Sequence, residues 1–370
     1  MRTVVLFNSD LSGGAGKFIL TLANAFQKLE VNVHVIIYNH NVDYAVPKGI
    51  AFHKLVNEHE ETQQKKEIAN RLKTLLDSIG EIDLIMSNSS PSNTILSMLQ
   101  HPRTYHCVHS AETKVHKGLA GFFKAMWRTR KYKKLYSHKN LITVSKELEA
   151  YILHTIGGKP KSIQTIYNPF DFKEIQHLSN AVIEEIPKEP YLIHIGRFDM
   201  VSKRQDILLK AYKQANVPFK LILLGEGEDK AKLEALVKEL GLGSKVIFHG
   251  YTDNPFAWLK HAKLFVFSSD FEGFGRVLAE ALIVGTPVVS TNCPTGPKEI
   301  LTGVLEDFLV PAGDVNALAE KIKQALTVYP DVENIDMSWL RDDVIAKQYI
   351  GIIDSISKHE NVVFKREELL

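Results

Sequence analysis

The sequence has few cysteines and no long apolar run, and each absence excludes a class of protein. The two cysteines, Cys107 and Cys293, lie far apart in the chain and form no C-x-x-C pair. A disulfide framework is therefore not expected, and a reducing compartment such as the cytoplasm is. No apolar run approaches the roughly 18 residues that cross a membrane. The opening MRTVVLFNSD turns polar after a short apolar run, which is typical of a first strand and not of a signal peptide.

A strong charge imbalance is missing as well. Lys and Arg number 45 against 43 Asp and Glu, and the net charge of +2 gives no general affinity for nucleic acid. The chain also has no Asp-x-Asp, no His-x-x-x-His and no cysteine cluster, so a metal-bridged site has little support. We therefore expect no metal and no cofactor. Cationic side chains and helix N-termini would have to neutralise any diphosphate ligand.

Apolar runs alternate with helical periodicity through most of the 370 residues, which is the pattern of doubly wound α/β sheets. In the first half, strands are predicted at 3–8, 31–38, 83–88, 104–109, 140–145 and 162–168. In the second half, strands are predicted at 191–196, 219–225, 245–250, 264–269, 287–291 and 303–310. Residues 169–189 lose the pattern and are interpreted as a linker.

Two such runs predict two Rossmann-like domains that face each other across a cleft. We expect an N-terminal domain over 1–180, a second domain over 186–335 and a C-terminal segment over 336–370 that is helical from Ser338 to Ser357. Parallel sheets bind ligands at the carboxyl ends of their strands. The residues that follow each strand are therefore the candidates for a site.

A glycine turn, SDLSGGAGKF at residues 9–18, joins the first strand to the first helix. Leu11 and Phe18 stand where a Walker A loop requires Gly and Ser or Thr, so a P-loop is excluded. Free backbone N–H groups around Gly14 suit a phosphate or a sugar oxygen. A tight turn without any ligand is the alternative.

The segment HIGRFDMVSKRQD follows the first strand of the second half. Arg197 leaves the end of that strand after Gly196, and Lys203 lies close to the next helix start. Two cations beside a helix N-terminus suit a diphosphate with no need of metal. A solvated cationic loop is the alternative, and it is easier to accept for Lys203 than for Arg197.

Two glutamates, Glu272 and Glu280, flank a glycine turn in SSDFEGFGRVLAEA, residues 268–281. The strand is expected to end at Ser269 and a helix to start near Arg276, with Gly275 allowing the tight entry. Glu272 then lies in a loop and Glu280 on the first or second turn of the helix, and both can bind sugar hydroxyls. One solvated and one capping glutamate is the alternative.

Two further strand ends carry candidate residues. In TNCPTGPKEIL, residues 291–301, Thr295 and Gly296 form a turn before a helix start, which suits a phosphate or a base, or is an ordinary turn. His109 ends the strand at 104–109, where a hydrogen-bonding or acid–base group of a cleft would lie. The chain has 15 histidines, and a structural role is the default interpretation for any one of them.

The segment 116–140 is basic and contains no acidic residue. Its apolar residues Leu119, Phe122, Phe123, Met126 and Trp127 recur with helical spacing. Another face carries Lys117, Lys124, Arg128 and Lys131. A basic amphipathic helix with aromatic residues is typical of binding to anionic membrane surfaces, and a core-packed helix with a solvated basic face is an equal alternative. Nucleic-acid binding is less favoured because no accompanying motif is present.

Taken together, these motifs resemble those of the family 4 (group 1) retaining glycosyltransferases of the GT-B fold, over nearly the whole chain. The resemblance rests on an E-x7-E motif from Glu272 to Glu280, on GRF with a downstream lysine, and on GGAG, IYNPFD and CPTGPKEIL. It implies a metal-independent enzyme whose last helix crosses back to the N-terminal domain. One departure stands out, because Arg204 occupies the position after the lysine where a glycine is frequent.

The resemblance also implies roles for individual residues. Arg197 and Lys203 would hold the donor diphosphate, Glu272 would contact the donor sugar, and Glu280 would bind the ribose. His109 would face the sugar from the N-terminal domain. The predicted catalytic residues are Glu272, His109, Arg197 and Lys203. The predicted donor-binding set is Gly14, Gly196, Arg197, Lys203, Phe274, Gly275, Glu280, Thr295 and Gly296.

The sequence thus predicts a retaining transferase that moves a sugar from a nucleotide sugar, of the UDP-hexose or N-acetylhexosamine type, to a glycan or lipid-linked acceptor. The basic helix predicts an anionic membrane partner and a peripheral location on the inner face of the cytoplasmic membrane, in bacterial polysaccharide or lipopolysaccharide assembly. Two other classes stay open. They are a nucleotide-sugar epimerase or phosphorylase on the same plan, and a non-catalytic membrane-associated binding protein.

Overall fold

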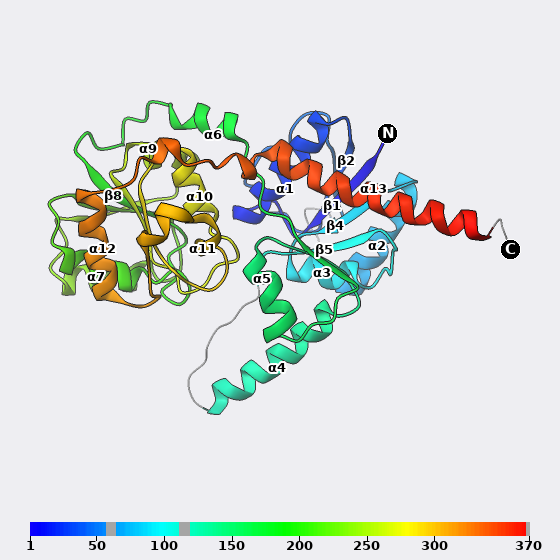
Figure 1. Cartoon of the computed structure of the whole chain (residues 1–370), viewed down its shortest axis with the longest axis horizontal. Coiled ribbons are helices and arrows are strands. Elements are labelled where there is room, and N and C mark those ends of the chain that lie inside the picture. Colours follow the sequence, from blue (N-terminus) through cyan, green and yellow to red (C-terminus); the bar gives the residue numbers. More distant parts are fainter. Residues whose placement is uncertain (57–63, 111–118, 368–370) are drawn as a thin grey trace. The chain divides into compact units, whose positions relative to one another are not determined.

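The computed structural model describes residues 1–56, 64–110 and 119–367. The chain forms two compact units (Figure 1). The first comprises Met1–Phe170 together with Ser338–Leu370, and the second comprises Asp171–Met337. Each is described by itself below.

The first unit contains a parallel sheet with strand order β3-β2-β1-β4-β5-β6-β7. Its strands are β1 Thr3–Asn8, β2 Asn32–Ile37, β3 Ala51–Lys54, β4 Leu84–Ser87, β5 Thr104–Val108, β6 Asn140–Thr143 and β7 Ser162–Thr165. The central strand β1 is hydrogen-bonded on both sides, so that Val4 pairs with Val33 of β2 and with Leu84 of β4. The order reverses between β1 and β4, which makes this edge of the sheet the switch point of a doubly wound fold.

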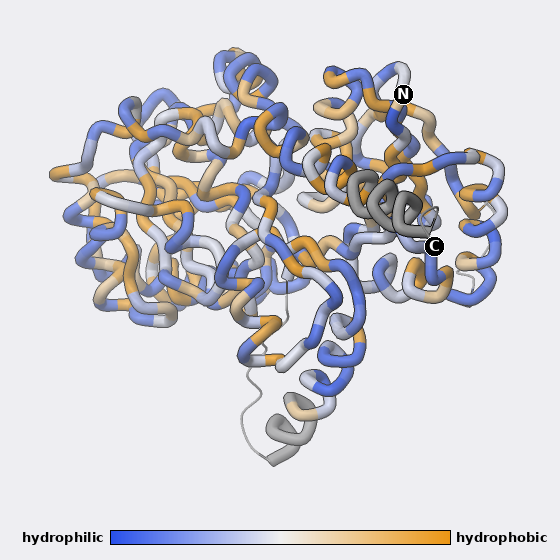
Figure 2. The backbone as a smooth tube through the Cα atoms, turned by 45° about the vertical axis from the view of Figure 1, so that its right-hand side comes forward, coloured by the Kyte–Doolittle hydropathy of each residue, from blue (hydrophilic) through white to orange (hydrophobic). Residues whose placement is uncertain are grey.

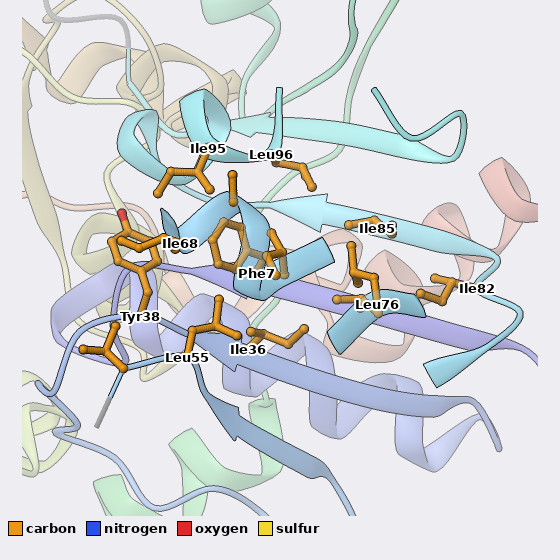
Figure 3. Packing of buried hydrophobic residues seen from close by; sticks show 14 residues of the cluster. Phe7, Ile36, Tyr38, Leu55, Ile68, Leu76, Ile82, Ile85, Ile95 and Leu96 are labelled. Atoms are coloured by element: carbon orange, nitrogen blue, oxygen red, sulfur yellow. The ribbon is translucent and has the colours of Figure 1, made fainter. Parts of the chain in front are cut away.

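Helices follow the strands of the first unit as the periodicity predicts. They are α1 Gly13–Lys28, α2 Lys65–Ile79, α3 Ser90–Leu96, α4 Leu119–Tyr136 and α5 Lys146–Ala150, which runs into a π-helical turn at Tyr151–Thr155. Ile68, Leu72 and Leu76 lie on one face of α2 at a spacing of four and are buried. They pack on Phe7 and other sheet residues to form one hydrophobic core (Figure 3).

The C-terminal helix α13, Asp342–Glu367, belongs to the first unit and confirms the predicted return of the chain to its N-terminal domain. It packs along α1 (Figure 1). The ring of Tyr349 meets that of Phe26 edge to face at 6.0 Å between centroids. At the start of α13, Lys28 Nζ lies 3.0 Å from the Asp342 carboxylate.

The second unit contains a parallel sheet with strand order β10-β9-β8-β11-β12-β13. Its strands are β8 Tyr191–Ile195, β9 Lys220–Leu224, β10 Val246–Gly250, β11 Leu264–Phe267, β12 Val288–Thr291 and β13 Leu309–Val310. Its helices are α6 Phe172–Ser179, α7 Gln205–Ala215, α8 Lys230–Glu239, α9 Pro255–His261, α10 Arg276–Ile283, α11 Pro297–Ile300 and α12 Val315–Thr327. The prediction of two doubly wound α/β sheets is confirmed.

Two local expectations differ from the structure. Residues 169–189 are not a plain linker, because α6 forms at Phe172–Ser179, capped by Asp171, and packs on α9. The boundary of the first unit therefore lies at Phe170 and not at residue 180. The predicted strand 303–310 is mainly a 3₁₀ helix, Gly303–Phe308, before the two-residue β13. Leu305 and Phe308 are buried at a spacing of three, which suits a helical turn and not the alternation of a strand.

Candidate functional site

The switch point of the second sheet lies between β8 and β11, the neighbouring strands at which the strand order reverses. In open parallel sheets, ligands bind at the carboxyl ends of the strands at such a point. The loop after β8 carries Gly196, Arg197 and Lys203, and the loop after β11 carries Glu272. Three of the predicted catalytic residues, Arg197, Lys203 and Glu272, therefore follow the two strands that flank the switch point.

The loop after β8 is ordered by Asp199. Its Oδ1 accepts hydrogen bonds from the backbone N–H groups of Val201 and Ser202 at 2.9 and 3.0 Å, and its Oδ2 accepts one from Ser202 Oγ at 2.6 Å. Burial alone would raise the pKa of Asp199, but these bonds and the nearby Arg197 outweigh it and lower the pKa to about 2. Arg197 Nη2 lies 3.1 Å from Asp199 Oδ2, while 72% of its side chain stays exposed. The guanidinium is therefore held beside the site yet open to a ligand.

Lys203 and Glu272, which are 69 residues apart in sequence, form a direct ion pair with 2.5 Å between Nζ and Oε1. Ser269 Oγ donates to the same carboxylate oxygen at 2.7 Å. The two side chains are only 23% and 13% exposed, so solvent screens the pair weakly. The Lys203 ammonium also lies 5.7 Å from the centre of the Phe267 ring. The structure thus brings together the lysine and the glutamate that the sequence placed near one ligand.

Arg204 resolves the departure from the family pattern. It takes the left-handed conformation that glycine favours, with φ of 52°, at the residue before α7. Its guanidinium binds the Asp206 carboxylate through two bonds, of 3.0 and 3.1 Å, and also binds Asp270 in the loop after β11. The bonds to Asp206 and Asp270 raise the pKa of Arg204. The turn is therefore kept, and the arginine joins the two loops of the site.

Glu280 lies on the second turn of α10, and the predicted start of that helix at Arg276 is confirmed. Gly275, with φ of 88°, forms the tight entry. Glu280 is 8% exposed, and its Oε1 lies 3.5 Å from Arg276 Nη2. A buried carboxylate beside a helix start can accept hydrogen bonds from ligand hydroxyl groups.

The loop after β12 packs on the loop that carries Glu272. Thr295 has φ of 68°, which is unusual for a β-branched residue, and its hydroxyl donates to the backbone oxygen of Glu272. A Cβ atom added to Gly296 would lie 2.1 Å from the backbone oxygen of Phe274. Strained backbone that its surroundings hold in place is a feature of ligand sites. Thr295 and Gly296 therefore shape the loop from Glu272 to Gly275.

In the first unit, the predicted residues Gly14 and His109 lie at the same edge of the sheet. His109 follows β5, and its ring packs edge to face on Phe18 of α1 at 4.6 Å between centroids. Its Nε2 is hydrogen-bonded to the side-chain oxygen of Asn88, whose amide nitrogen lies 3.4 Å from the backbone oxygen of Ala15. Gly14 is an exposed residue of the first turn of α1. Asn88 thus connects the histidine to the glycine turn.

Sequence reasoning missed several residues of these edges. Asn88, Asp199 and Asp270 each follow a strand within a few residues, which is the one signal that would have pointed to them. Within the described ranges, no group of three His, Cys, Asp or Glu side chains is arranged to hold a metal ion. The charges that face the second switch point are instead those of Arg197, Lys203 and the carboxylates around them.

Helix α4 is shorter than the predicted segment 116–140. It spans Leu119–Tyr136, Lys117 lies outside the described residues, and for Lys124 only the backbone is described. Trp127 is 63% exposed and Lys131 Nζ lies 5.8 Å from its ring centre. The tube of α4 is mostly hydrophilic in its described part (Figure 2). Throughout the described ranges, no helix is long and apolar enough to span a membrane.

Comparisons with known proteins match both units of the chain. Residues 12–174 match the family model described as Glycosyltransferase Family 4, and residues 178–336 match the model described as Glycosyl transferases group 1. The chain is 27% identical over 323 residues to the N-acetylgalactosamine-N,N'-diacetylbacillosaminyl-diphospho-undecaprenol 4-alpha-N-acetylgalactosaminyltransferase of Campylobacter jejuni, covering 85% of this chain and 87% of that protein. It is 26% identical over 214 residues to the lipopolysaccharide 1,6-galactosyltransferase of Escherichia coli, covering 55% and 58% of the two chains.

Solved structures share the fold over almost the full length. The Anabaena protein Alr3699/HepE in complex with UDP superposes with a TM-score of 0.71 at 20% identity, over 96% of this chain and all of the other (100%). A glycosyltransferase from Rickettsia africae superposes with a TM-score of 0.74 at 15% identity, over 96% and 99% of the two chains.

Proposed function

Because the chain belongs to the family 4 (group 1) glycosyltransferases, with their two-domain GT-B fold, we propose that it is a retaining, metal-independent transferase that uses a UDP-linked hexose or N-acetylhexosamine. Its acceptor is a glycan or a lipid-linked saccharide in the assembly of a bacterial polysaccharide or lipopolysaccharide. The named activities of the Campylobacter and Escherichia relatives support this class of acceptor. The UDP bound by the Anabaena neighbour supports the nucleotide.

The observation that carries the proposal is the contact of Lys203 with Glu272, together with the exposed Arg197 in the same loop as Lys203. A donor diphosphate is a stronger partner for the lysine than one carboxylate, because it offers more negative charge and more acceptor oxygens. Donor binding therefore draws the Lys203 ammonium onto the diphosphate and releases Glu272 for the hydroxyl groups of the sugar. The exposed Arg197 adds a second cation.

These groups stabilise the charge that develops during transfer. As the glycosidic bond breaks, the leaving diphosphate gains negative charge and the sugar becomes positive. Lys203 and Arg197 are already in place for the first of these charges, and the Glu272 carboxylate for the second. Glu280 binds the ribose, and its burial beside Arg276 fixes its position.

The two glutamates separate this mechanism in a kinetic test. Glu280→Ala removes a donor-binding contact and should raise KM for the donor about tenfold, with a smaller change in kcat. Glu272→Ala removes a contact that strengthens in the transition state and should lower kcat by about a hundredfold or more. The opposite pattern would mean that the two roles are exchanged. No effect of either change on turnover would contradict this donor site.

Products and conditions test the rest of the proposal. UDP-sugars are incubated with and without saccharide or undecaprenyl-linked acceptors, and the anomeric configuration of the product is determined by NMR. Activity should persist in EDTA, and the product should keep the donor's configuration. Conversion of the donor without an acceptor would favour an epimerase or phosphorylase. Absence of any turnover with every donor would favour a binding protein.

We also propose that α4 holds the enzyme on an anionic membrane surface at the inner face of the cytoplasmic membrane. The 63% exposure of Trp127 supports this over core packing of that face, because an exposed indole beside cationic side chains suits a lipid interface. A triple variant, Lys124→Glu, Arg128→Glu and Lys131→Glu, should lose flotation with anionic liposomes. Recovery of this variant equal to the wild type would contradict the idea.

A charge-matched control distinguishes a local interface from a general effect of net charge. Lys188, Lys210 and Lys238 are exposed residues of the second unit. Their replacement by glutamate changes the net charge by the same amount and should leave flotation unchanged.

A further inference from the structure

A buried histidine lies beneath the loop that carries Arg197. His194 is the fourth residue of β8 and has no exposed surface (0%). Its Nδ1 lies 2.9 Å from the backbone oxygen of Val266 in β11. A carbonyl oxygen only accepts, so Nδ1 carries the proton and Nε2 is left as an acceptor. Burial lowers the pKa of His194 to about 4, so the ring is neutral at physiological pH.

Gln205 continues the connection from this ring to the loop. It is the first residue of α7 and is also fully buried (0%). Its amide nitrogen lies 3.3 Å from His194 Nε2 and 2.8 Å from the backbone oxygen of Arg197. Its amide oxygen accepts from the backbone N–H of Asp199 at 3.3 Å. A continuous set of bonds thus runs from β11 through both side chains to the backbone on either side of Phe198.

We propose that His194 and Gln205 are positioning residues of the transfer reaction, which fix the backbone of residues 197–199 and so aim Arg197 at the donor diphosphate. The inference rests on the proposed function, since the diphosphate is the ligand assigned there. Neither side chain reaches the ligand itself. They act through the peptide groups that they hold.

The chemistry of the pair favours positioning over simple filling of the core. A buried amide and a buried imidazole destabilise an interior unless their polar atoms are paired, so aliphatic residues would serve a purely packed strand better. Here the bonds of Gln205 to the main chain lead to the loop of the site. The ring also lies close under the loop, because a Cβ at Gly196 would be 3.5 Å from His194 Nε2.

The test uses substitutions that remove one end of the connection at a time. His194→Phe keeps a ring of similar size and removes both of its bonds. His194→Gln places an acceptor where Nε2 was and keeps the bond from Gln205, whereas His194→Asn keeps only the bond to Val266. KM for the UDP-sugar should rise about fivefold to thirtyfold in the Phe and Asn variants, with KM for the acceptor unchanged. The Gln variant should recover most of the donor affinity.

The double variant His194→Phe, Gln205→Leu should have a KM for the UDP-sugar no higher than that of the more impaired single variant, because both residues act through one connection. His106 offers a matched control. It is a buried histidine of the first unit, 4% exposed, with Nδ1 at 3.0 Å from Ser87 Oγ. His106→Gln should lower thermal stability about as much as the His194 substitutions do, and it should leave KM for the donor as in the wild type.

Hydrogen exchange separates failure of this inference from failure of the proposed function. In His194→Phe, the amides of residues 198–204 should exchange faster while the rest of the second unit is unchanged. Donor KM equal to the wild type, or equal shifts in donor and acceptor KM, would overturn the positioning role. If the wild type neither binds UDP nor transfers any sugar, the proposed function fails, and the donor role of these residues fails with it. Unchanged exchange of the amides of residues 198–204 in His194→Phe would overturn the structural connection as well.

Discussion

The contact between Gly296 and Phe274 yields the sharpest prediction about the site. Gly296 has φ of 108°, and an added Cβ would lie 2.1 Å from the Phe274 backbone oxygen and 2.5 Å from its carbonyl carbon. Both atoms belong to the main chain, so no side chain can rotate to make room. Gly296→Ala must therefore displace the loop from Glu272 to Gly275 by about 1 Å, since real Cβ atoms do not approach other atoms closer than 3.0 Å.

Two terms make up the expected loss of stability. A non-glycine residue at such a backbone conformation costs about 1–3 kcal/mol, and the overpacking adds about 1–3 kcal/mol. Gly285 separates the two terms, because it has φ of 82° in the same unit and no atom within 4 Å of an added Cβ. Gly285→Ala should therefore lower the free energy of unfolding by the first term alone. Gly296→Ala should lower it by about 2–6 kcal/mol.

The functional comparison is made at a temperature where both variants are folded. Urea denaturation gives the free energies of unfolding, and titration calorimetry gives the affinity for UDP. Gly285→Ala should bind UDP like the wild type, whereas Gly296→Ala should bind at least tenfold more weakly because its loop has moved. Equal affinity of the two alanine variants for UDP would show that the packing of these loops does not form the nucleotide site.

Further predictions concern the loop connection and acid stability. Arg204→Gly removes the left-handed strain but also the bonds between the two loops, so UDP affinity should fall about threefold to tenfold; adding Asp270→Asn should weaken it little more, and additive losses in calorimetry would argue against the connection. The pKa of buried His106 is lowered to about 3 and that of His194 to about 4, each from 6.5. The stability that comes from burying these rings in the neutral form is complete above pH 6.5. It is lost as the pH falls from 6.5 toward the folded-state pKa values, because the unfolded chain then binds more protons than the folded chain. Urea denaturation should show that each histidine lowers the free energy of unfolding by about 2 kcal/mol at pH 5 relative to neutral pH. Replacing either histidine by Gln should remove its part of this pH dependence.

The sequence predicted the two sheets well, and with them the loops that share one edge, because both depend on local patterns. Runs of apolar residues mark strands that are buried on both faces, and parallel strands place their following loops at one edge. Lys203 and Glu272 were therefore expected near one ligand. Their direct contact was not, because it joins residues 69 apart and depends on how two loops pack.

The elements that escaped prediction are short, so few residues carry their pattern. The helix at Phe172–Ser179 is short and largely polar, and β3, Ala51–Lys54, is a four-residue edge strand. The connection through His194 and Gln205 was missed for a different reason. Neither residue is unusual in its own segment, and the meaning of each depends on the partner that the fold supplies.

The chain leaves the first unit after Phe170 and returns to it at Ser338, and this has a consequence for how the protein folds during synthesis. The second unit is inserted into the first, and Phe170 is hydrogen-bonded to the backbone of Leu340 and Asp342 where the chain re-enters. Arg2 meets Asp354 across 352 residues of sequence. The surface of α1 that packs against α13 therefore stays uncovered until α13 leaves the ribosome, whereas the inserted unit is contiguous in sequence and is complete earlier. Truncations that remove α13 should thus destabilise the sheet of the first unit, which is far from the cut in sequence. They should leave the sheet of the second unit, which directly precedes the cut in sequence, as stable as before.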